Sequence, residues 1–204
     1  MTEKEKMLAG KIYDTSDSEI GKLRLQAHKL SAKYNLTTED ETGKREKILQ
    51  KLLPDGNGAC LQGPIYFDYG VFTKFGKNCF ANFNFTVLDC APVTIGDDVF
   101  FGPNCTLATP VHPLCTSDRK MRVKPDGTVY DLEYAKPITI GKGCWLASNV
   151  VVTGGVTIGE NCVIGAGSVV TRDIPPDSFA AGVPCKVIRR ITEEDKLSNH
   201  PELF

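Results

Sequence analysis

The sequence predicts a mainly β fold, a column of short strands stacked in repeating coils, with a helical segment ahead of it. Three observations predict this fold. A large apolar residue followed by a small one recurs every six residues in the second half of the chain, a period that fits neither a helix nor an alternating strand. Helical signals are confined to the residues before the repeats, and one polar stretch interrupts the repeats.

Residues 1–58 are expected to form an N-terminal helical segment packed on the column. Thr2 with Glu5, and Thr38 with Glu41, have the spacing of a capping box, and Gly10 marks the end of a first short helix. Apolar residues with helical spacing form one face of each of two further stretches: Ile20, Leu23, Ala27, Leu30 and Tyr34, then Ile48, Leu49, Leu52 and Leu53. The turn-rich residues 54–58 mark the change from helix to strand.

The repeats are expected to occupy residues 59–190. The apolar-small pairs begin at Ile95, Phe101, Leu107, Ile140, Leu146, Val152, Ile158 and Ile164, with a weaker pattern over residues 75–87. A smaller residue stands four places after each large one, namely Val99, Cys105, Val111, Cys144, Val150, Val156, Cys162 and Ser168. One bulky and one small inward side chain on each six-residue side predict a narrow, filled interior.

The repeats stop between His112 and Pro137, where polar and turn-forming residues cannot continue such an interior. Residues of about 112–137 are therefore expected to leave the column as an excursion loop, and long excursions from a regular scaffold usually carry function. Residues 191–204 are expected to form a C-terminal tail.

Composition limits the function classes. The chain has 204 residues, 41% hydrophobic content and a net charge of −1, which indicates one domain and offers no charge pattern for nucleic acid or a membrane surface. Four of its eight cysteines occupy fourth positions of repeats and none forms a CxxC pair, so we expect buried thiols and no metal site. These features together predict a cytoplasmic protein.

Short motifs along nearly the whole chain give a family resemblance. They lie at residues 5–10, 69–70, 81–83, 109–113, 137–141 and 182–189. Together and in this order they resemble the maltose/galactoside O-acetyltransferase group of the hexapeptide-repeat acyltransferases. The resemblance implies a left-handed parallel β-helix, a homotrimer with sites at subunit interfaces, acetyl-CoA as co-substrate and transfer of acetyl to a sugar hydroxyl.

Acetyl transfer to a hydroxyl needs a general base, and histidine suits this task near neutral pH. The chain has three histidines: His28, His200 and His112. His112 stands where the last repeat meets the excursion loop and matches the family's base. The resemblance places Asn82 near the base and the acceptor, although a place in an asparagine ladder or a turn of the stack is the alternative role for this residue.

Four further residues match family positions around the acceptor. Asp17 and Asp68 match contacts to the sugar, although Asp17 could equally cap a helix. Asp14 is the alternative if the match at the N-terminal end is displaced. Glu133 matches a common family acid, and its alternative role is to anchor the loop. Cys90 stands where galactoside enzymes have an acidic acceptor contact, which argues against a galactoside as the natural acceptor.

The resemblance also implies a set of donor-binding residues. Trp145 and Ser148 would meet the thioester end of acetyl-CoA, with Ser148 supplying a backbone N–H to the oxyanion, while the alternative for Trp145 is burial in a subunit contact. The remaining positions match contacts to the pantetheine, adenine and phosphates: Ala166, Thr171, Arg172, Lys186 and Arg189. Basic side chains suit the phosphates of coenzyme A, and Arg190 could share this task.

Three alternatives were weighed. A zinc carbonic anhydrase of the same repeat class needs three clustered histidines, and only His112 lies in the stack. A non-catalytic scaffold would have no need for both a base beside the loop and basic residues near the C-terminal end. Acetylation of another acceptor, such as serine, an amino sugar, a lipo-oligosaccharide or an antibiotic, stays open.

Overall fold

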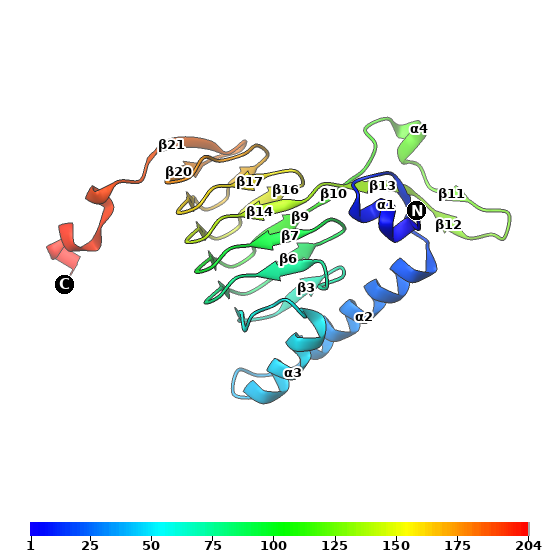
Figure 1. Ribbon diagram of the computed structural model, residues 1–204, viewed down its shortest axis with the longest axis horizontal. Coiled ribbons are helices and arrows are strands. Elements are labelled where there is room, and N and C mark those ends of the chain that lie inside the picture. Colours follow the sequence, from blue (N-terminus) through cyan, green and yellow to red (C-terminus); the bar gives the residue numbers. More distant parts are fainter. Residues whose placement is uncertain (204) are drawn as a thin grey trace.

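Three parallel β-sheets form the three sides of a column in this computed structural model, which describes residues 1–203 (Figure 1). Successive coils contribute strands to the three sides in turn. In one coil these are β7 (Val93–Ile95), β8 (Phe100–Phe101) and β9 (Thr106–Ala108). The four-stranded sheet contains β4 (Thr73–Phe75), β7 (Val93–Ile95), β14 (Ile138–Ile140) and β17 (Thr157–Ile158). The five-stranded sheet contains β3 (Ile65–Phe67), β6 (Phe85–Leu88), β9 (Thr106–Ala108), β16 (Val151–Thr153) and β19 (Val169–Val170).

The seven-stranded sheet forms the third side and ends in the one antiparallel pair of the column. It contains β2 (Cys60–Leu61), β5 (Phe80–Ala81), β8 (Phe100–Phe101), β15 (Trp145–Leu146), β18 (Val163–Ile164), β20 (Ser178–Ala181) and β21 (Lys186–Arg190). Equivalent residues stack in register, so that Phe101, Leu146 and Ile164 follow one another inside the column. All three are almost fully buried.

The interior confirms the predicted side-chain pattern with one exception. The large residues of the repeats are buried, and so are the fourth-position residues Val99, Cys105, Cys144, Val150, Val156, Cys162 and Ser168. Val111 is only half-buried, so its assignment to a fourth position inside the stack is wrong. The reason is that the chain leaves the column at β10 (Pro110–Val111), which pairs with a strand of the excursion instead.

Three helices precede the column, and two of them cover its first coil (Figure 1). They are α1 (Glu3–Leu8), α2 (Ser18–Asn35) and α3 (Thr42–Leu52). The Arg45 guanidinium on α3 donates to the carbonyls of Leu61 and Gln62, at 2.6 and 2.8 Å. The Tyr34 hydroxyl on α2 donates to the same Leu61 carbonyl. These bonds attach both helices to backbone groups of the first coil.

The capping signals had different outcomes. Thr2 and Glu5 form the predicted capping box at α1, and Gly10 adopts a φ of +68° just after that helix, a left-handed conformation that suits glycine. The second box does not cap a helix. The Thr38 N–H donates to the Glu41 carboxylate at 3.0 Å, but α3 begins only at Thr42 and has no side-chain cap.

The excursion between Ala108 and Ile138 is more ordered than a loop of polar residues suggests. It contains β10, α4 (Thr116–Arg119), a hairpin of β11 (Arg122–Val123) with β12 (Val129–Tyr130), and β13 (Leu132–Ala135). β13 pairs on one side with β10 and on the other with β1 (Tyr13–Asp14) from the N-terminal segment. This small sheet joins residues more than a hundred positions apart beside the column.

The C-terminal tail continues from β21 in three short 3-10 turns, η1 (Glu193–Asp195), η2 (Leu197–Asn199) and η3 (Pro201–Leu203). It extends away from the column on the side opposite the excursion (Figure 1). Among the described residues, no helix has both the length and the apolar character needed to cross a membrane.

Candidate active site

His112 lies directly after β10, where the chain leaves the column, and two carboxylates flank its ring. Its Nδ1 is 3.6 Å from Asp131 Oδ2, and its Nε2 is 3.6 Å from Glu133 Oε2. The imidazole remains 48% exposed, whereas the Glu133 side chain is 12% exposed. The ring is therefore open to a bound molecule and has one carboxylate beside each nitrogen.

Glu133 is held from the side of the N-terminal segment. The Tyr13 hydroxyl donates to Glu133 Oε1, and both residues are buried. Burial raises the pKa of Glu133, and the hydrogen bond from Tyr13 and the nearby His112 ring offset this only in part. Burial likewise raises the pKa of Tyr13, so the phenol keeps its proton and acts as a donor.

Cys90 connects Glu133 with Asp68. Its Sγ donates to Asp68 Oδ2 at 3.7 Å, and the residue is 4% exposed. Burial, together with the Glu133 and Asp68 carboxylates, raises the pKa of the Cys90 thiol. The thiol is therefore a neutral group among carboxylates. On the far side of Asp68, its Oδ1 is 3.6 Å from His28 Nε2 on α2.

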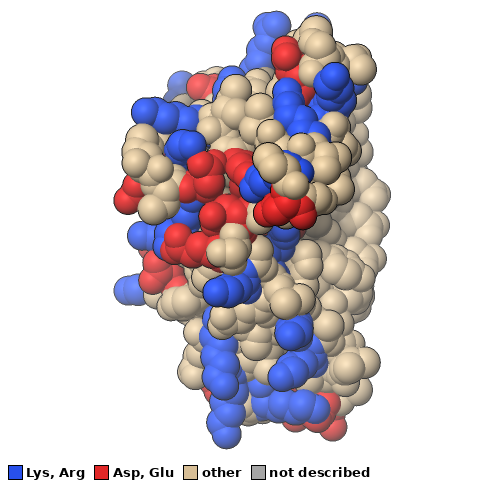
Figure 2. All heavy atoms as spheres, turned by 90° about the vertical axis from the view of Figure 1, so that its right-hand side faces the viewer, with Lys and Arg blue, Asp and Glu red and all other residues tan. Residues whose placement is uncertain are grey.

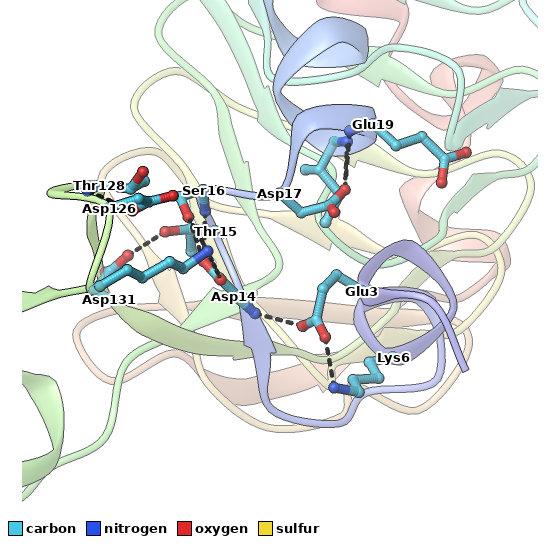
Figure 3. A network of polar contacts seen from close by, with 12 residues as sticks. Glu3, Lys6, Asp14, Thr15, Ser16, Asp17, Glu19, Asp126, Thr128 and Asp131 are labelled. Atoms are coloured by element: carbon cyan, nitrogen blue, oxygen red, sulfur yellow. Dashed lines mark hydrogen bonds and ion pairs between the residues drawn. The ribbon is translucent and has the colours of Figure 1, made fainter.

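The N-terminal segment and the excursion meet in a polar network (Figure 3). The Asp17 carboxylate caps α2, accepting from the backbone N–H groups of Glu19 and Ile20 at 2.9 and 3.2 Å. Asp14 instead pairs with Lys124 of the hairpin at 2.5 Å. Burial acts to raise the pKa of Asp14, but the hydrogen bonds from Lys124 and Ser16 and the charge of Lys124 together outweigh it and lower the pKa.

Asp131 belongs to the same network. The Thr15 hydroxyl donates to Asp131 Oδ1 (Figure 3). The other carboxylate oxygen, Asp131 Oδ2, faces His112. The segment before α2 therefore helps to position the carboxylate beside the candidate base. Figure 2, which views this face, shows acidic side chains gathered across its middle with lysine and arginine above and below them.

Asn82 is not part of an asparagine ladder. The ladder is formed by Asn84, Asn104 and Asn149, whose side-chain amides bond in series at 2.9 and 3.0 Å and whose φ values are all positive. Asn82 lies at the corner after β5, and its Oδ1 accepts from the Phe83 N–H at 2.8 Å. Its NH₂ group donates to no protein acceptor among the described residues.

The expected donor residues lie along the coils away from His112. Trp145 is 51% exposed on β15, and Ser148 lies in the following turn. Ala166, Thr171, Arg172 and Lys186 are all exposed. Arg189 forms a bidentate pair with Asp195 at 2.6 and 2.8 Å, and Arg190 Nη2 is 3.5 Å from Asp177. No hydrogen bond or ion pair within the described part of one chain joins this group to His112.

The structure thus brings together four of the expected site residues: His112, Glu133, Cys90 and Asp68. Asp17 caps the nearby helix α2. The residues expected to bind acetyl-CoA lie elsewhere on the column. The structure adds Tyr13, Asp131 and His28, which the sequence analysis did not select for the site. A signal for Asp131 existed, because residues two apart in an extended segment share a face and Asp131 and Glu133 have this spacing. Nothing in the local sequence connects Tyr13 or His28 with the excursion.

Comparison with known protein families identifies the class of protein. Residues 6–56 match the maltose acetyltransferase hexapeptide capping motif, and residues 137–172 match the bacterial transferase hexapeptide model. Residues 92–112 match the hexapeptide repeat of succinyl-transferase. The column and its helical segment are therefore those of a hexapeptide-repeat acyltransferase.

Full-length relatives narrow this class. The chain is 42% identical to galactoside O-acetyltransferase of Escherichia coli over 193 residues, covering 94% of this chain and 91% of the relative. A maltose O-acetyltransferase structure from Clostridium difficile matches with TM-score 0.85 and 43% identity, over 95% and 99% of the two chains. The chain belongs to the maltose/galactoside O-acetyltransferase family, which confirms the predicted family, left-handed β-helix and enzyme class.

Solved relatives also hold the expected co-substrate. A galactoside acetyltransferase in complex with coenzyme A matches with TM-score 0.87 and 41% identity, over 96% of this chain and 94% of the other. A hexapeptide-repeat acetyltransferase of Vibrio cholerae, complexed with acetyl-CoA, matches with TM-score 0.81 and 34% identity, over 95% and 100% of the chains. The prediction of acetyl-CoA as co-substrate is confirmed for this family.

Proposed function

We propose that the protein transfers the acetyl group of acetyl-CoA to a hydroxyl of a sugar, with His112 as general base. The observation that carries the proposal is the half-exposed His112 ring, 3.6 Å from Asp131 on one nitrogen and 3.6 Å from Glu133 on the other. Family membership supports the reaction class, since the relatives named above are galactoside and maltose O-acetyltransferases.

The reaction is direct transfer. His112 takes the proton of the acceptor hydroxyl while its oxygen attacks the acetyl carbonyl carbon, forming a new C–O bond. The C–S bond then breaks, and the imidazolium returns the proton to the departing thiolate. No acetyl-enzyme forms. The Ser148 backbone N–H is the proposed donor to the oxyanion that develops on the carbonyl oxygen.

The two carboxylates beside His112 have separate supporting roles. Asp131 holds one ring nitrogen and is itself held by Thr15. Glu133 lies by the other nitrogen, and because burial raises its pKa, it accepts a proton more readily than an exposed carboxylate does. We assign acceptor contacts to Asn82, Asp68, Cys90 and Asp17, since the cap on α2 uses only Oδ1 of Asp17 and leaves its Oδ2 for the acceptor. Because the Cys90 thiol is neutral, an acceptor hydroxyl would find a weaker polar partner there than a carboxylate.

We propose that the active unit is a homotrimer whose sites lie between subunits. The outer face of the seven-stranded sheet carries Phe80, Phe100 and Trp145 in one stacked row. Phe100 and Trp145 are 49% and 51% exposed, and large aromatic side chains in a row on an outer face favour burial against another subunit. Closed symmetry is usual for soluble homo-oligomers.

Such a seam would also complete the donor site. Trp145 and Ser148 lie on this side of the column, and Ala166, Thr171 and Arg172 follow in later turns. Lys186 and Arg189 on β21 would meet the phosphates of coenzyme A. Since no hydrogen bond or ion pair joins these residues to His112 within the described part of one chain, we propose that the base and the donor group come from different subunits.

We also propose a cytoplasmic location. All eight cysteines are free thiols, which is typical of proteins kept in a reducing compartment. Fractionation of the source cells would test this.

The experiment that tests the function measures free thiol released from acetyl-CoA with a panel of acceptors. The panel contains hexoses, galactosides, glucosides, serine, amino sugars and hydroxyl-bearing antibiotics. His112→Ala is expected to lower kcat by about a hundredfold or more, with affinity for acetyl-CoA nearly unchanged. His200→Ala, in the tail, is the control. Equal turnover in wild type and His112→Ala would remove His112 from the mechanism, and transfer to only a non-sugar acceptor would change the substrate class.

A further inference from the structure

An ion pair between helix α2 and the column lies beside the acceptor residues, and no step of the reaction uses it. His28 Nε2 on α2 lies 3.6 Å from Oδ1 of Asp68, the residue directly after β3. The His28 side chain is 53% exposed and that of Asp68 is 23% exposed. The pair therefore lies at the surface of the site, where a bound molecule can reach the carboxylate.

Two side chains hold the Asp68 carboxylate, and of these only His28 can bring a positive charge to it. The Cys90 Sγ donates to Asp68 Oδ2 at 3.7 Å, and a thiol is a weak donor. Within residues 1–203 no other side chain forms a hydrogen bond or ion pair with Asp68. Since each carboxylate oxygen has two lone pairs, Asp68 can keep both neighbours and accept a further hydrogen bond from a ligand.

The packing of α2 on β3 sets His28 opposite Asp68. At the end of α2, Asn35 donates to the Ile65 carbonyl at 2.9 Å and accepts from the Ile65 N–H at 2.8 Å. From Asn35 back to His28 the helix rises about 10.5 Å, at about 1.5 Å per residue. From Ile65 forward to Asp68 the strand rises about 10 Å, at about 3.3 Å per residue. Because these lengths match, the bonds at Ile65 bring the His28 ring level with Asp68.

We propose that His28 is a positioning residue, which through its ion pair holds the Asp68 carboxylate in the orientation that accepts a hydrogen bond from the acceptor. The inference rests on the proposed function, which assigns an acceptor contact to Asp68. His28 touches no reacting atom. It acts on acceptor affinity alone, because the His112 ring is flanked by Asp131 and Glu133 instead.

His28→Gln tests this role, because glutamine removes the charge of the ring and keeps a polar side chain. Ion pairs with this much exposure are weak, so we expect the KM for the acceptor to rise by about three- to fivefold. The kcat and the KM for acetyl-CoA should change by less than about 1.5-fold, since a contact made equally in the ground state and the transition state affects binding only.

Two further variants show whether the charge at position 28 is responsible. His28→Lys restores a cation there, and its acceptor KM should return to within about twofold of the wild-type value. Lys29→Gln is the matched control, because it removes a positive charge from the adjacent exposed position of α2, and it should leave the kinetic constants unchanged. A merely structural role for His28 would instead lower Tm and kcat together, and lysine would not reverse the loss.

A double-mutant cycle shows whether the effect passes through Asp68. Asp68→Asn should itself raise the acceptor KM, and in that background His28→Gln should add less than about 1.5-fold. Independent, multiplying effects of the two substitutions would overturn the inference. An unchanged acceptor KM in His28→Gln, or equal changes in the KM for acceptor and for acetyl-CoA, would overturn it as well.

The same assay separates this inference from the proposed function, because all constants are measured with the acceptor that the wild-type enzyme uses best. Wild-type transfer to a sugar with no effect of His28→Gln would refute the positioning role alone. Transfer to a non-sugar acceptor only would refute the proposed substrate class, and the cycle run with that acceptor would decide the role of His28. Absence of transfer to every acceptor of the panel would refute both.

Discussion

Replacing Tyr13 with phenylalanine removes one hydroxyl and tests whether the N-terminal segment supports the candidate active site. The Tyr13 hydroxyl is a hydrogen-bond donor to Glu133, and the two residues are 2% and 9% exposed. Phenylalanine keeps the ring and the pairing of β1 with β13. The variant therefore isolates the hydrogen bond to a buried carboxyl group.

The magnitude follows from the burial of Glu133. Leaving a buried hydrogen-bonding group without its partner costs about 1–3 kcal/mol, and we take about 2 kcal/mol here because Cys90 and His112 remain nearby. For a chain of this length each kcal/mol shifts Tm by roughly 2–4 °C, so Tyr13→Phe should lower Tm by about 4–8 °C. Since the Tyr13 hydrogen bond lowers the pKa of Glu133, its loss should raise that pKa further.

The assay is thermal unfolding at one fixed protein concentration, followed by circular dichroism, together with kcat at neutral pH. Tyr134→Phe is the matched control, because Tyr134 follows Glu133 on β13 and its hydroxyl forms no hydrogen bond with the described residues. A Tm change below about 1 °C in Tyr13→Phe, or an equal change in both variants, would refute the reasoning.

Two other predictions concern the column. Burial raises the pKa of Asp89 above 3.8, so its contribution to the stability of the fold falls as pH rises through the pKa of the folded state. In urea unfolding between about pH 4 and 7, the stability of the wild type should therefore fall relative to that of Asp89→Asn. Parallel stability curves for the two proteins would contradict this. A Cβ at Gly96 would lie 2.5 Å from the Lys142 backbone nitrogen, so Gly96→Ala should cost about 1–3 kcal/mol or more in urea unfolding. Gly43→Ala, whose Cβ meets nothing within 4 Å, should instead gain about 0.5–1 kcal/mol, and equal effects at both sites would argue against close contact between coils.

Most of the column could be predicted because its signal is local and repeated. Each coil places the same kind of side chain at the same position, so Phe101, Leu146 and Ile164 can be assigned to the interior without knowing their neighbours. The prediction for Val111 was wrong where the repeat ends, because an isolated last position looks the same whether the chain continues or leaves. Thr38 and Glu41 show a similar limit, since their spacing predicts a cap but not where the helix starts.

The candidate site was predictable only in part. His112 could be selected because it stands at the junction of repeat and excursion and matches a family motif, and Glu133 because it precedes the next repeat. Asn82 and Asn84 could not be told apart in role from spacing alone, and the structure shows that Asn84 forms the ladder. His28 and Tyr13 could not be connected with the site, because each is brought there by helix and strand packing.

Local patterns in the amino-acid sequence are enough to predict the β-helix, the covering helices, the break in the repeats and the position of the histidine beside that break, since all of these depend on short-range periodicity. Tertiary structure decided which groups surround that histidine. Tyr13 and Glu133 are separated by 120 positions, and their contact depends on β1 pairing with β13 beside the column. Local preferences carry no information on such a pairing, because it is selected by the burial and hydrogen bonding of the whole folded chain.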